Sequence, residues 1–191
     1  MTPNTIGTSL QPIALIGYRG CGKTVVAREI ASLIGGQAVD TDELVLDLAG
    51  KSITDIFADE GESVFRRYES QVIADVVEHP PRVLSVGGGA VLDGRNVRRL
   101  RSACFVVWLV ASAETLWQRI SNDPLSASQR PLLTDSGGLD EVRSVLGQRE
   151  ESYRNAAQAS IDTTDRTPKE VAREVIALAR RSGGDSQQVT T

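Results

Sequence analysis

Short apolar runs alternate along this chain with longer segments whose apolar residues recur at helical spacing. The runs typical of buried strands are residues 13–16, 38–39, 83–86 and 104–110, with a weaker one at 159–162. Because these runs are short and continuously apolar, they predict strands covered on both faces, as in a parallel sheet. The pattern therefore favours an α/β fold with three layers, α/β/α, and a central parallel five-stranded sheet.

The segments between the runs predict the helices that cover this sheet. Apolar residues recur at helical spacing after the first run, and Gly35 is placed to end that helix. A longer helix is expected from about Glu62, and another is expected to open at Pro168. Ligands of such sheets bind beyond the carboxyl ends of the strands, so the functional residues are expected there.

Length and composition are those of one globular domain. The chain has 191 residues, of which 40% are hydrophobic and 24% charged. We place the domain at residues 12–180. Residues 1–11 and 181–191 are rich in Thr, Ser, Gly and Gln, so we predict flexible tails at both ends.

Several classes of partner are disfavoured by the sequence. No apolar run approaches the roughly 20 residues of a membrane-spanning helix, and the N-terminus lacks the features of a secretory signal. We therefore expect a cytoplasmic protein without a membrane partner. The net charge of -4 argues against nucleic acid, which usually requires a clustered basic excess.

Residues 17–24, GYRGCGKT, match the phosphate-loop pattern GxxxxGK[ST] between the first apolar run and the first helix. Gly17, Gly20 and Gly22 allow the backbone to curl with its N–H groups pointing inward. The helix that follows adds the positive end of its dipole. This nest predicts a polyphosphate site, and the alternative is a plain glycine-rich turn.

The other residues of the loop specify the ligand further. Lys23 supplies a point charge for the β and γ phosphates, and the hydroxyl of Thr24 is placed to coordinate Mg²⁺. Cys21 lies in the same loop near a helix N-terminus, where a thiol pKa can be lowered, but it also suits a small loop filler. The loop therefore predicts a nucleotide polyphosphate bound with Mg²⁺.

Two carboxylates follow the second apolar run in the sequence VDTD, residues 39–42. Side chains two apart in an extended segment point the same way, so Asp40 and Asp42 are expected to share one pocket. For each of them, the alternative is a capping role at the start of the following helix.

From about residue 12 to residue 178 the chain resembles the shikimate kinase family. Beyond the phosphate loop and the DTD sequence, the resemblance rests on FRRYE at 65–69, GGG at 87–89, RPLL at 130–133, Arg149 with Tyr153, and RTP at 166–168. It implies a fold like that of the P-loop nucleoside monophosphate kinases, with a mobile lid at about residues 121–138. It also implies a monomer that phosphorylates the 3-hydroxyl of shikimate with MgATP, in aromatic amino acid biosynthesis.

The resemblance gives roles to the charged residues around the acceptor. Asp40 helps to hold Mg²⁺ through water, and Asp42 accepts a hydrogen bond and then the proton of the attacking hydroxyl. Arg66 and Arg149 grip the substrate carboxylate, because a guanidinium presents paired donors to two carboxylate oxygens. Glu69 lies three residues after Arg66, on the same helical face, and is expected to orient its guanidinium.

Further roles follow from the same resemblance. Gly87, Gly88 and Gly89 let the substrate approach the backbone, although a plain loop start is the alternative. Arg130 closes over the phosphates with the lid and offsets charge on the transferring group.

The adenine side of the nucleotide site also follows from the resemblance. Arg119 stacks on the adenine, and Arg166 and Pro168 close its other side. Pro168 also suits the first position of a helix.

Two other functions remain open at this point. A related P-loop kinase of another small metabolite, gluconate-like or a nucleoside monophosphate, would share the phosphate loop. A non-catalytic ATP-binding regulator would typically lack the acceptor-side carboxylate or the lid arginine. Asp42 and Arg130 are both present, which favours an enzyme.

Overall fold

The computed structural model describes residues 10–123 and 138–185, and these ranges contain a parallel sheet of five strands. The strands are β1 (Ile13–Ile16), β2 (Ala38–Asp40), β3 (Val83–Ser85), β4 (Phe105–Val110) and β5 (Ala159–Asp162). Their order across the sheet is β2-β3-β1-β4-β5, and each pairing is parallel. The predicted three-layer fold with a parallel five-stranded sheet is confirmed.

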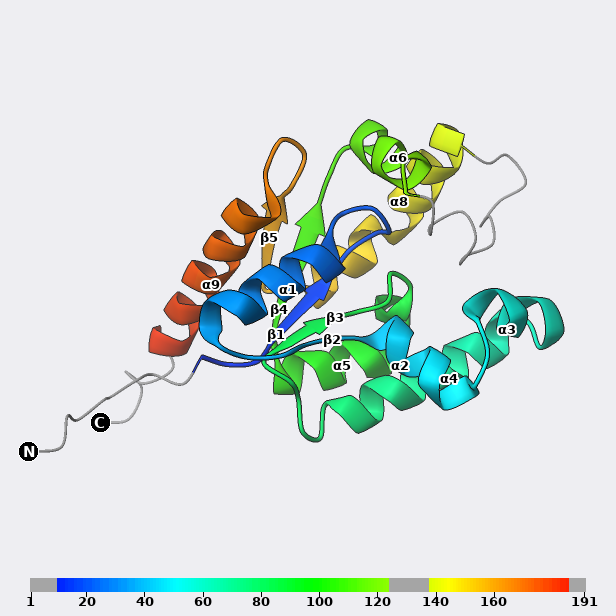
Figure 1. The fold of residues 1–191 in the computed structure, drawn as a ribbon, viewed down its shortest axis with the longest axis horizontal. Helices are drawn as coiled ribbons and strands as arrows, with labels where there is room; N and C mark the ends of the chain where they lie inside the picture. The colour runs from blue at the N-terminus through cyan, green and yellow to red at the C-terminus, as the bar shows by residue number, and fades with distance from the viewer. Residues whose placement is uncertain (1–9, 124–137, 186–191) are drawn as a thin grey trace, which may run out of the picture.

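Helices connect the strands and cover both faces of the sheet (Figure 1). They are α1 (Lys23–Ile34), α2 (Thr41–Ala49), α3 (Ile53–Asp59), α4 (Glu62–Val76), the 3-10 helix η1 (Ala90–Leu92), α5 (Gly94–Ala103), α6 (Ala113–Ser121), α8 (Gly138–Ala156) and α9 (Pro168–Asp185). The predicted starts at Glu62 and Pro168 are confirmed. Gly35 ends α1 with a positive φ of 66°, as predicted.

The predicted boundaries need one correction at the C-terminus. Helix α9 continues to Asp185, so residues 181–185, which the sequence assigned to a tail, are helical. The glycines and serine there have low helix propensity, but the preceding turns are anchored by buried residues such as Ala179, and the helix propagates beyond them. Most of the predicted lid, residues 124–137, lies outside the described residues.

The central strand β1 contributes side chains to both faces of the sheet. Ile13 and Leu15 belong to a core cluster shared with α1 and α9, whereas Ala14 and Ile16 belong to a second cluster shared with α4, α5 and α8. All four side chains are fully buried. This alternation across a strand buried on both sides explains why the sequence shows a continuous apolar run.

Helices α2, α3 and α4 build a smaller cluster of their own at one end of the sheet (Figure 1). Val45, Ile56 and Phe65 pack together there, with Ile53 and Val72 completing the buried set. Helix α3 extends away from the sheet in this view. The cluster forms a wall on the acceptor side of the site described below.

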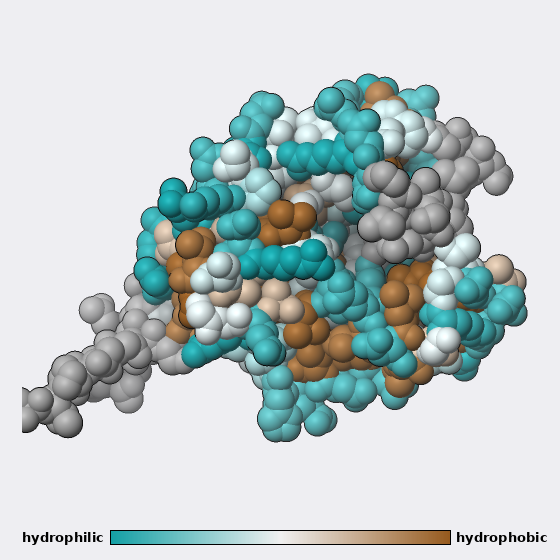
Figure 2. All heavy atoms as spheres, in the orientation of Figure 1, coloured by the Kyte–Doolittle hydropathy of each residue, from teal (hydrophilic) through white to brown (hydrophobic). Residues whose placement is uncertain are grey.

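The face of the molecule in Figure 2 is mainly polar, with separate apolar areas between the charged side chains. The exposed large apolar residues, Val25, Leu33, Leu46, Leu48 and Leu92, come from α1, α2 and η1. Among the described helices, none combines the length and the apolar character that crossing a membrane requires.

Helix α1 offers a matched test of the core. Ile30 is fully buried between the sheet and α9, whereas Leu33 on the same helix is 45% exposed. We expect Ile30→Ala to lower the free energy of unfolding by about 2–5 kcal/mol, because it leaves a cavity. Leu33→Ala should change it by about 0.5 kcal/mol or less. Urea denaturation measures both, and equal losses would contradict this description of the core.

Candidate functional site

The loop between β1 and α1 is shaped by glycines that no other residue could easily replace. Gly17, Gly20 and Gly22 have φ values of 141°, 80° and 91°, a region that disfavours side chains. At Gly17 an added Cβ would also lie 2.5 Å from the carbonyl oxygen of Leu109. The loop therefore has the tight curl that a phosphate nest requires, and it leads directly into the N-terminus of α1.

Lys23, the first residue of α1, folds back over this loop. Its Nζ donates to the carbonyl oxygens of Gly17 at 2.9 Å and Tyr18 at 3.0 Å, and the residue is buried. Cys21 is buried beside it, with Sγ 3.9 Å from Nζ. The ammonium group therefore holds a fixed position at the loop, with its charge solvated by backbone carbonyls.

Asp40 accepts hydrogen bonds from two polar side chains and one backbone N–H at the end of β2. Its Oδ2 accepts hydrogen bonds from the hydroxyls of Thr24 at 2.7 Å and Ser85 at 2.9 Å. Its Oδ1 accepts from the backbone N–H of Asp42 at 3.0 Å and caps α2. The capping role of Asp40 is therefore observed through Oδ1, and Oδ2 lies beside the Thr24 hydroxyl.

The same hydroxyl and carboxylate oxygens suit a hard cation. Mg²⁺ prefers oxygen ligands and retains several waters, so Thr24, Asp40 and Ser85 form a donor set that fits it. The described residues contain no group of three or more His, Cys, Asp or Glu that could hold a metal. A cation here would therefore depend on water and substrate phosphates for its other ligands.

The expectation that Asp40 and Asp42 share one pocket is wrong. Helix α2 begins at Thr41, so the segment is not extended and the two side chains diverge. Asp40 lines a small cavity with Thr24 and Ser85, whereas Asp42 lines a larger one on the acceptor side. Asp40 is also the N-cap of α2, which removes that alternative role from Asp42.

The larger cavity encloses about 520 Å³, part of it open to solvent. It is lined by Tyr18, Arg19, Asp42, Ile53, Phe57, Phe65, Arg66, Glu69, Gly88, Gly89 and Arg149. The structure therefore brings together a guanidinium from α4, another from α8, a carboxylate from α2 and two residues of the phosphate loop. Segments separated by more than a hundred residues meet at this one cavity.

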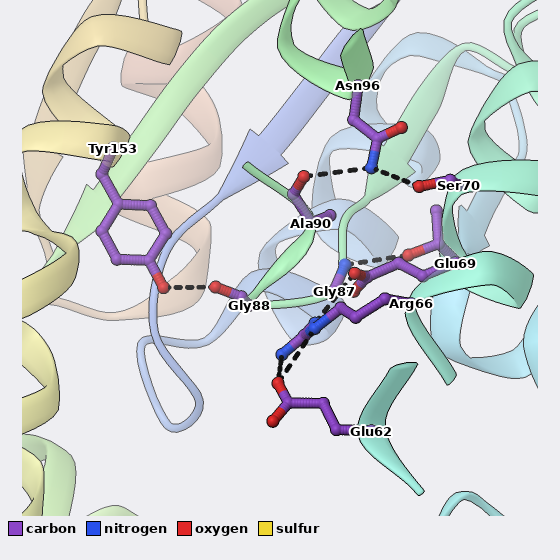
Figure 3. Close-up of polar contacts among 10 residues, drawn as sticks. Glu62, Arg66, Glu69, Ser70, Gly87, Gly88, Ala90, Asn96 and Tyr153 are labelled. Atoms are coloured by element: carbon purple, nitrogen blue, oxygen red, sulfur yellow. Dashed lines mark hydrogen bonds and ion pairs between the residues drawn. The ribbon is translucent and has the colours of Figure 1, made fainter. Parts of the chain in front are cut away.

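Arg66 is held between two glutamates of its own helix (Figure 3). Its Nη1 donates to Glu69 Oε2 at 2.8 Å, and its Nη2 donates to Glu62 Oε1 at 2.9 Å. Glu69 is only 2% exposed, and burial raises the pKa of its carboxyl, opposed by the charge of Arg66. The predicted spacing of Arg66 and Glu69 on one helical face is therefore matched by a direct ion pair.

The glycine run after β3 divides into separate contacts. The N–H of Gly87 donates to the hydroxyl of Thr41 at 2.8 Å, and Gly87 does not line the larger cavity. The carbonyl of Gly88 accepts from the Tyr153 hydroxyl at 2.6 Å, and burial raises the pKa of that tyrosine (Figure 3). Gly88 and Gly89 remain at the cavity wall.

Arg119 connects the phosphate loop to the segment after β5. Its Nη1 donates to the Thr163 hydroxyl at 3.1 Å and to the carbonyl of Gly20 at 3.4 Å. Its Nη2 donates to the carbonyls of Thr163 at 2.6 Å and Thr164 at 3.1 Å. Arg119 therefore lies at the edge of the loop, away from the acceptor cavity.

The segment after β5 also carries the other two residues predicted to flank adenine. Arg166, which precedes α9, forms an ion pair at 2.6 Å with Glu174 of that helix. Pro168 is the first residue of α9. Arg130, predicted to act from the lid, lies outside the described residues.

Three comparisons with known proteins agree with this geometry. A family model described as shikimate kinase matches residues 19–180. A shikimate kinase of Rhodopirellula baltica is 39% identical over 176 residues, 92% of this chain and 94% of that protein, and one of Symbiobacterium thermophilum is 40% identical over 171 residues, 90% and 97%. A solved structure of shikimate kinase from Acinetobacter baumannii in complex with shikimate has a TM-score of 0.84 at 31% identity and covers 92% of this chain and 96% of that one.

The chain belongs to the shikimate kinase family.

In this family member, sequence patterns missed several residues that line the site. Tyr18 and Arg19 occupy variable positions of the phosphate-loop pattern, so no letter of that pattern selects them. Ser85 lies two residues before the glycine run and could have been found as a polar residue ending an apolar strand. Ile53 and Phe57 carry no signal that separates a cavity wall from an ordinary core.

Gly89 tests whether the glycine run shapes the acceptor cavity. A Cβ at this position would approach the guanidinium of Arg66, with Cζ at 2.6 Å, and would displace that flexible group. We expect Gly89→Ala to raise the KM of the acceptor acid roughly tenfold to a hundredfold, because small displacements of a binding group are amplified. Gly147→Ala on α8, where a Cβ meets nothing within 4 Å, is the control. Unchanged kinetics of Gly89→Ala would contradict the expectation.

The buried carboxyl of Glu69 predicts a pH dependence of stability. Because its pKa is raised on folding, the folded state binds more protons than the unfolded state between the ordinary carboxyl pKa and the raised one. Stability contributed by this group therefore falls as pH rises through that window. We expect the free energy of unfolding of Glu69→Gln, relative to the wild type, to rise over the same window. Urea titrations from about pH 4 upward measure it, and parallel curves would contradict the assignment.

Proposed function

We propose that this protein transfers the γ-phosphoryl group of MgATP to the 3-hydroxyl of shikimate, giving ADP and shikimate 3-phosphate. Family membership supports the kinase activity and the acceptor. One structural observation carries the proposal further: a single cavity is lined by residues 18–19 of the phosphate loop, by Asp42 and by the guanidinium groups of Arg66 and Arg149. Such a reaction belongs to aromatic amino acid biosynthesis, and we place the enzyme in the cytoplasm as a monomer.

On the donor side, the glycine-lined nest and Lys23 would bind the β and γ phosphates. Thr24 and Asp40 would hold Mg²⁺. When bound, this cation would offset the negative charge of the phosphates. We assign Arg130 to the charge that develops on the transferring group. Arg119 would contact one side of the adenine, and the segment from Arg166 to Pro168 the other.

On the acceptor side, Arg66 and Arg149 would bind the carboxylate of the acid through paired hydrogen bonds. Glu69, which already pairs with Arg66 at 2.8 Å, orients that guanidinium. Gly88 and Gly89 let the ring approach the backbone. The apolar side chains at the wall, among them Phe57 and Phe65, suit the carbon framework of the ring.

The chemical step then needs one proton acceptor. The 3-hydroxyl oxygen forms the new bond to the γ-phosphorus while the bond between that phosphorus and the β,γ-bridging oxygen breaks, and ADP leaves with that oxygen. Asp42 accepts the hydroxyl proton, as the aspartate of a kinase catalytic loop does. Its place in the first turn of α2, beside the cavity, suits this role.

The proposal is tested by following ADP release from MgATP with shikimate as the acceptor, with gluconate and a nucleoside monophosphate as alternatives. Among these acceptors, we expect turnover only with shikimate. Asp42→Asn should lower kcat by about 10²–10⁴-fold, the usual contribution of a general base. Arg66→Ala and Arg149→Ala should act mainly on the KM of shikimate. Turnover with gluconate but not with shikimate would sink the assignment, and equal kinetics in all variants would remove the proposed carboxylate clasp.

A further inference from the structure

Arg19 of the phosphate loop and Glu141 of α8 form an ion pair at the edge of the acceptor cavity. Arg19 Nη2 donates to Glu141 Oε1 at 2.9 Å. The Glu141 side chain is fully buried, and that of Arg19 is 11% exposed. The contact joins residues 122 positions apart, and none of the sequence motifs includes Glu141.

This pair is poorly suited to a purely stabilising role. Removing two charges from water offsets most of their mutual attraction, and an apolar pair of similar volume often stabilises a fold equally well. In addition, the Nε of Arg19 is buried with no hydrogen-bond partner among the described residues. An unsatisfied buried donor is unfavourable, which lowers the stability that the pair can contribute. The pair is therefore better explained by the position it enforces than by the stability it adds.

Helix α8 is fastened at a second point on the acceptor side. Tyr153 donates its hydroxyl to the carbonyl of Gly88 at 2.6 Å and stacks on Trp108 with ring centroids 5.7 Å apart. Glu141 and Tyr153 are twelve residues apart, which is about 18 Å along a helix. Arg149 lies between them, one turn before Tyr153. The helix that carries Arg149 is thus held at one end to the phosphate loop and at the other to the glycine run.

We propose that the Arg19–Glu141 pair is a positioning device that couples the two substrate sites: it fastens the phosphate loop to the helix that carries Arg149. This inference rests on the proposed function. A nucleotide that orders the loop also fixes Arg19, and through Glu141 it fixes the start of α8. The acceptor acid then meets a guanidinium whose position is already restricted, and it binds more tightly. By linkage, the acid tightens the nucleotide by the same factor.

The coupling is measured by titrating shikimate calorimetrically without nucleotide and in the presence of MgADP, which does not react. In the wild type we expect MgADP to tighten shikimate binding at least about fivefold, the lower end of typical coupling. In Glu141→Gln and Arg19→Met that ratio should fall to about one. For Glu141→Gln, whose residue does not line the cavity, the affinity for shikimate alone should change by about twofold or less. The double variant Arg19→Met/Glu141→Met should lose no more of the ratio than either single variant, because all three break the same Arg19–Glu141 contact.

Matched variants separate coupling from a general loss of structure. Arg143 on the same helix forms an exposed ion pair with Glu114 of α6 at 2.7 Å, so Glu114→Gln removes a bridge of similar length outside the cavity and should keep the wild-type ratio. Arg19→Lys keeps the positive charge and should restore part of the ratio. If Glu141→Gln fails to fold, the double variant carries the test, because it removes both charges of the Arg19–Glu141 pair.

The outcomes distinguish this inference from the proposed function. If Arg19→Met and the double variant keep the coupling ratio of the wild type and shikimate turnover is intact, the role of the pair is overturned and the proposed function stands. A ratio near one in the wild type itself also overturns the role of the pair. Failure of the wild type to bind shikimate at all overturns both, and it is seen before any variant is made.

Discussion

Buried charge is the constraint on which this site depends. A phosphoryl-transfer site must keep cations and carboxylates out of water, and isolated buried charges are unstable. Three cations of the site have partners: Lys23 is solvated by loop carbonyls, Arg66 is held by two glutamates, and Arg19 is paired with Glu141. Asp40 is satisfied by two hydroxyls and a backbone N–H. Substrates therefore enter a site in which these charged groups already have hydrogen-bond partners.

The parallel sheet is what brings these groups together. Because β1, β2 and β3 run in the same direction, the segments after them reach the same edge: the phosphate loop, the start of α2 and the glycine run. Helix α8 comes from a distant part of the chain and contacts both the phosphate loop and the glycine run. The sheet thus sets which segments meet, and the helices set the distance between donor and acceptor groups.

The interior of the site separates two tasks that the sequence places side by side. The carboxylates of the DTD sequence are two residues apart, yet one belongs to the cation-suited oxygens beside Thr24 and the other to the acceptor cavity. The start of α2 at Thr41 creates this division, because a helical turn rotates Asp42 away from Asp40. The Thr41 hydroxyl then accepts the N–H of Gly87 and ties the two segments together.

The sequence by itself determined the strands, the phosphate loop and the family. Apolar runs buried on both faces, a glycine pattern that requires positive φ, and Arg66 spaced three residues from Glu69 are local features, and local sterics and periodicity dictate them. Only the tertiary structure decided that Arg19 meets Glu141, that Asp40 and Asp42 diverge, and that α9 continues past residue 180. These outcomes arise from contacts between segments distant in the chain, or from a helix boundary set by its neighbours, and neither leaves a periodic signal in the sequence.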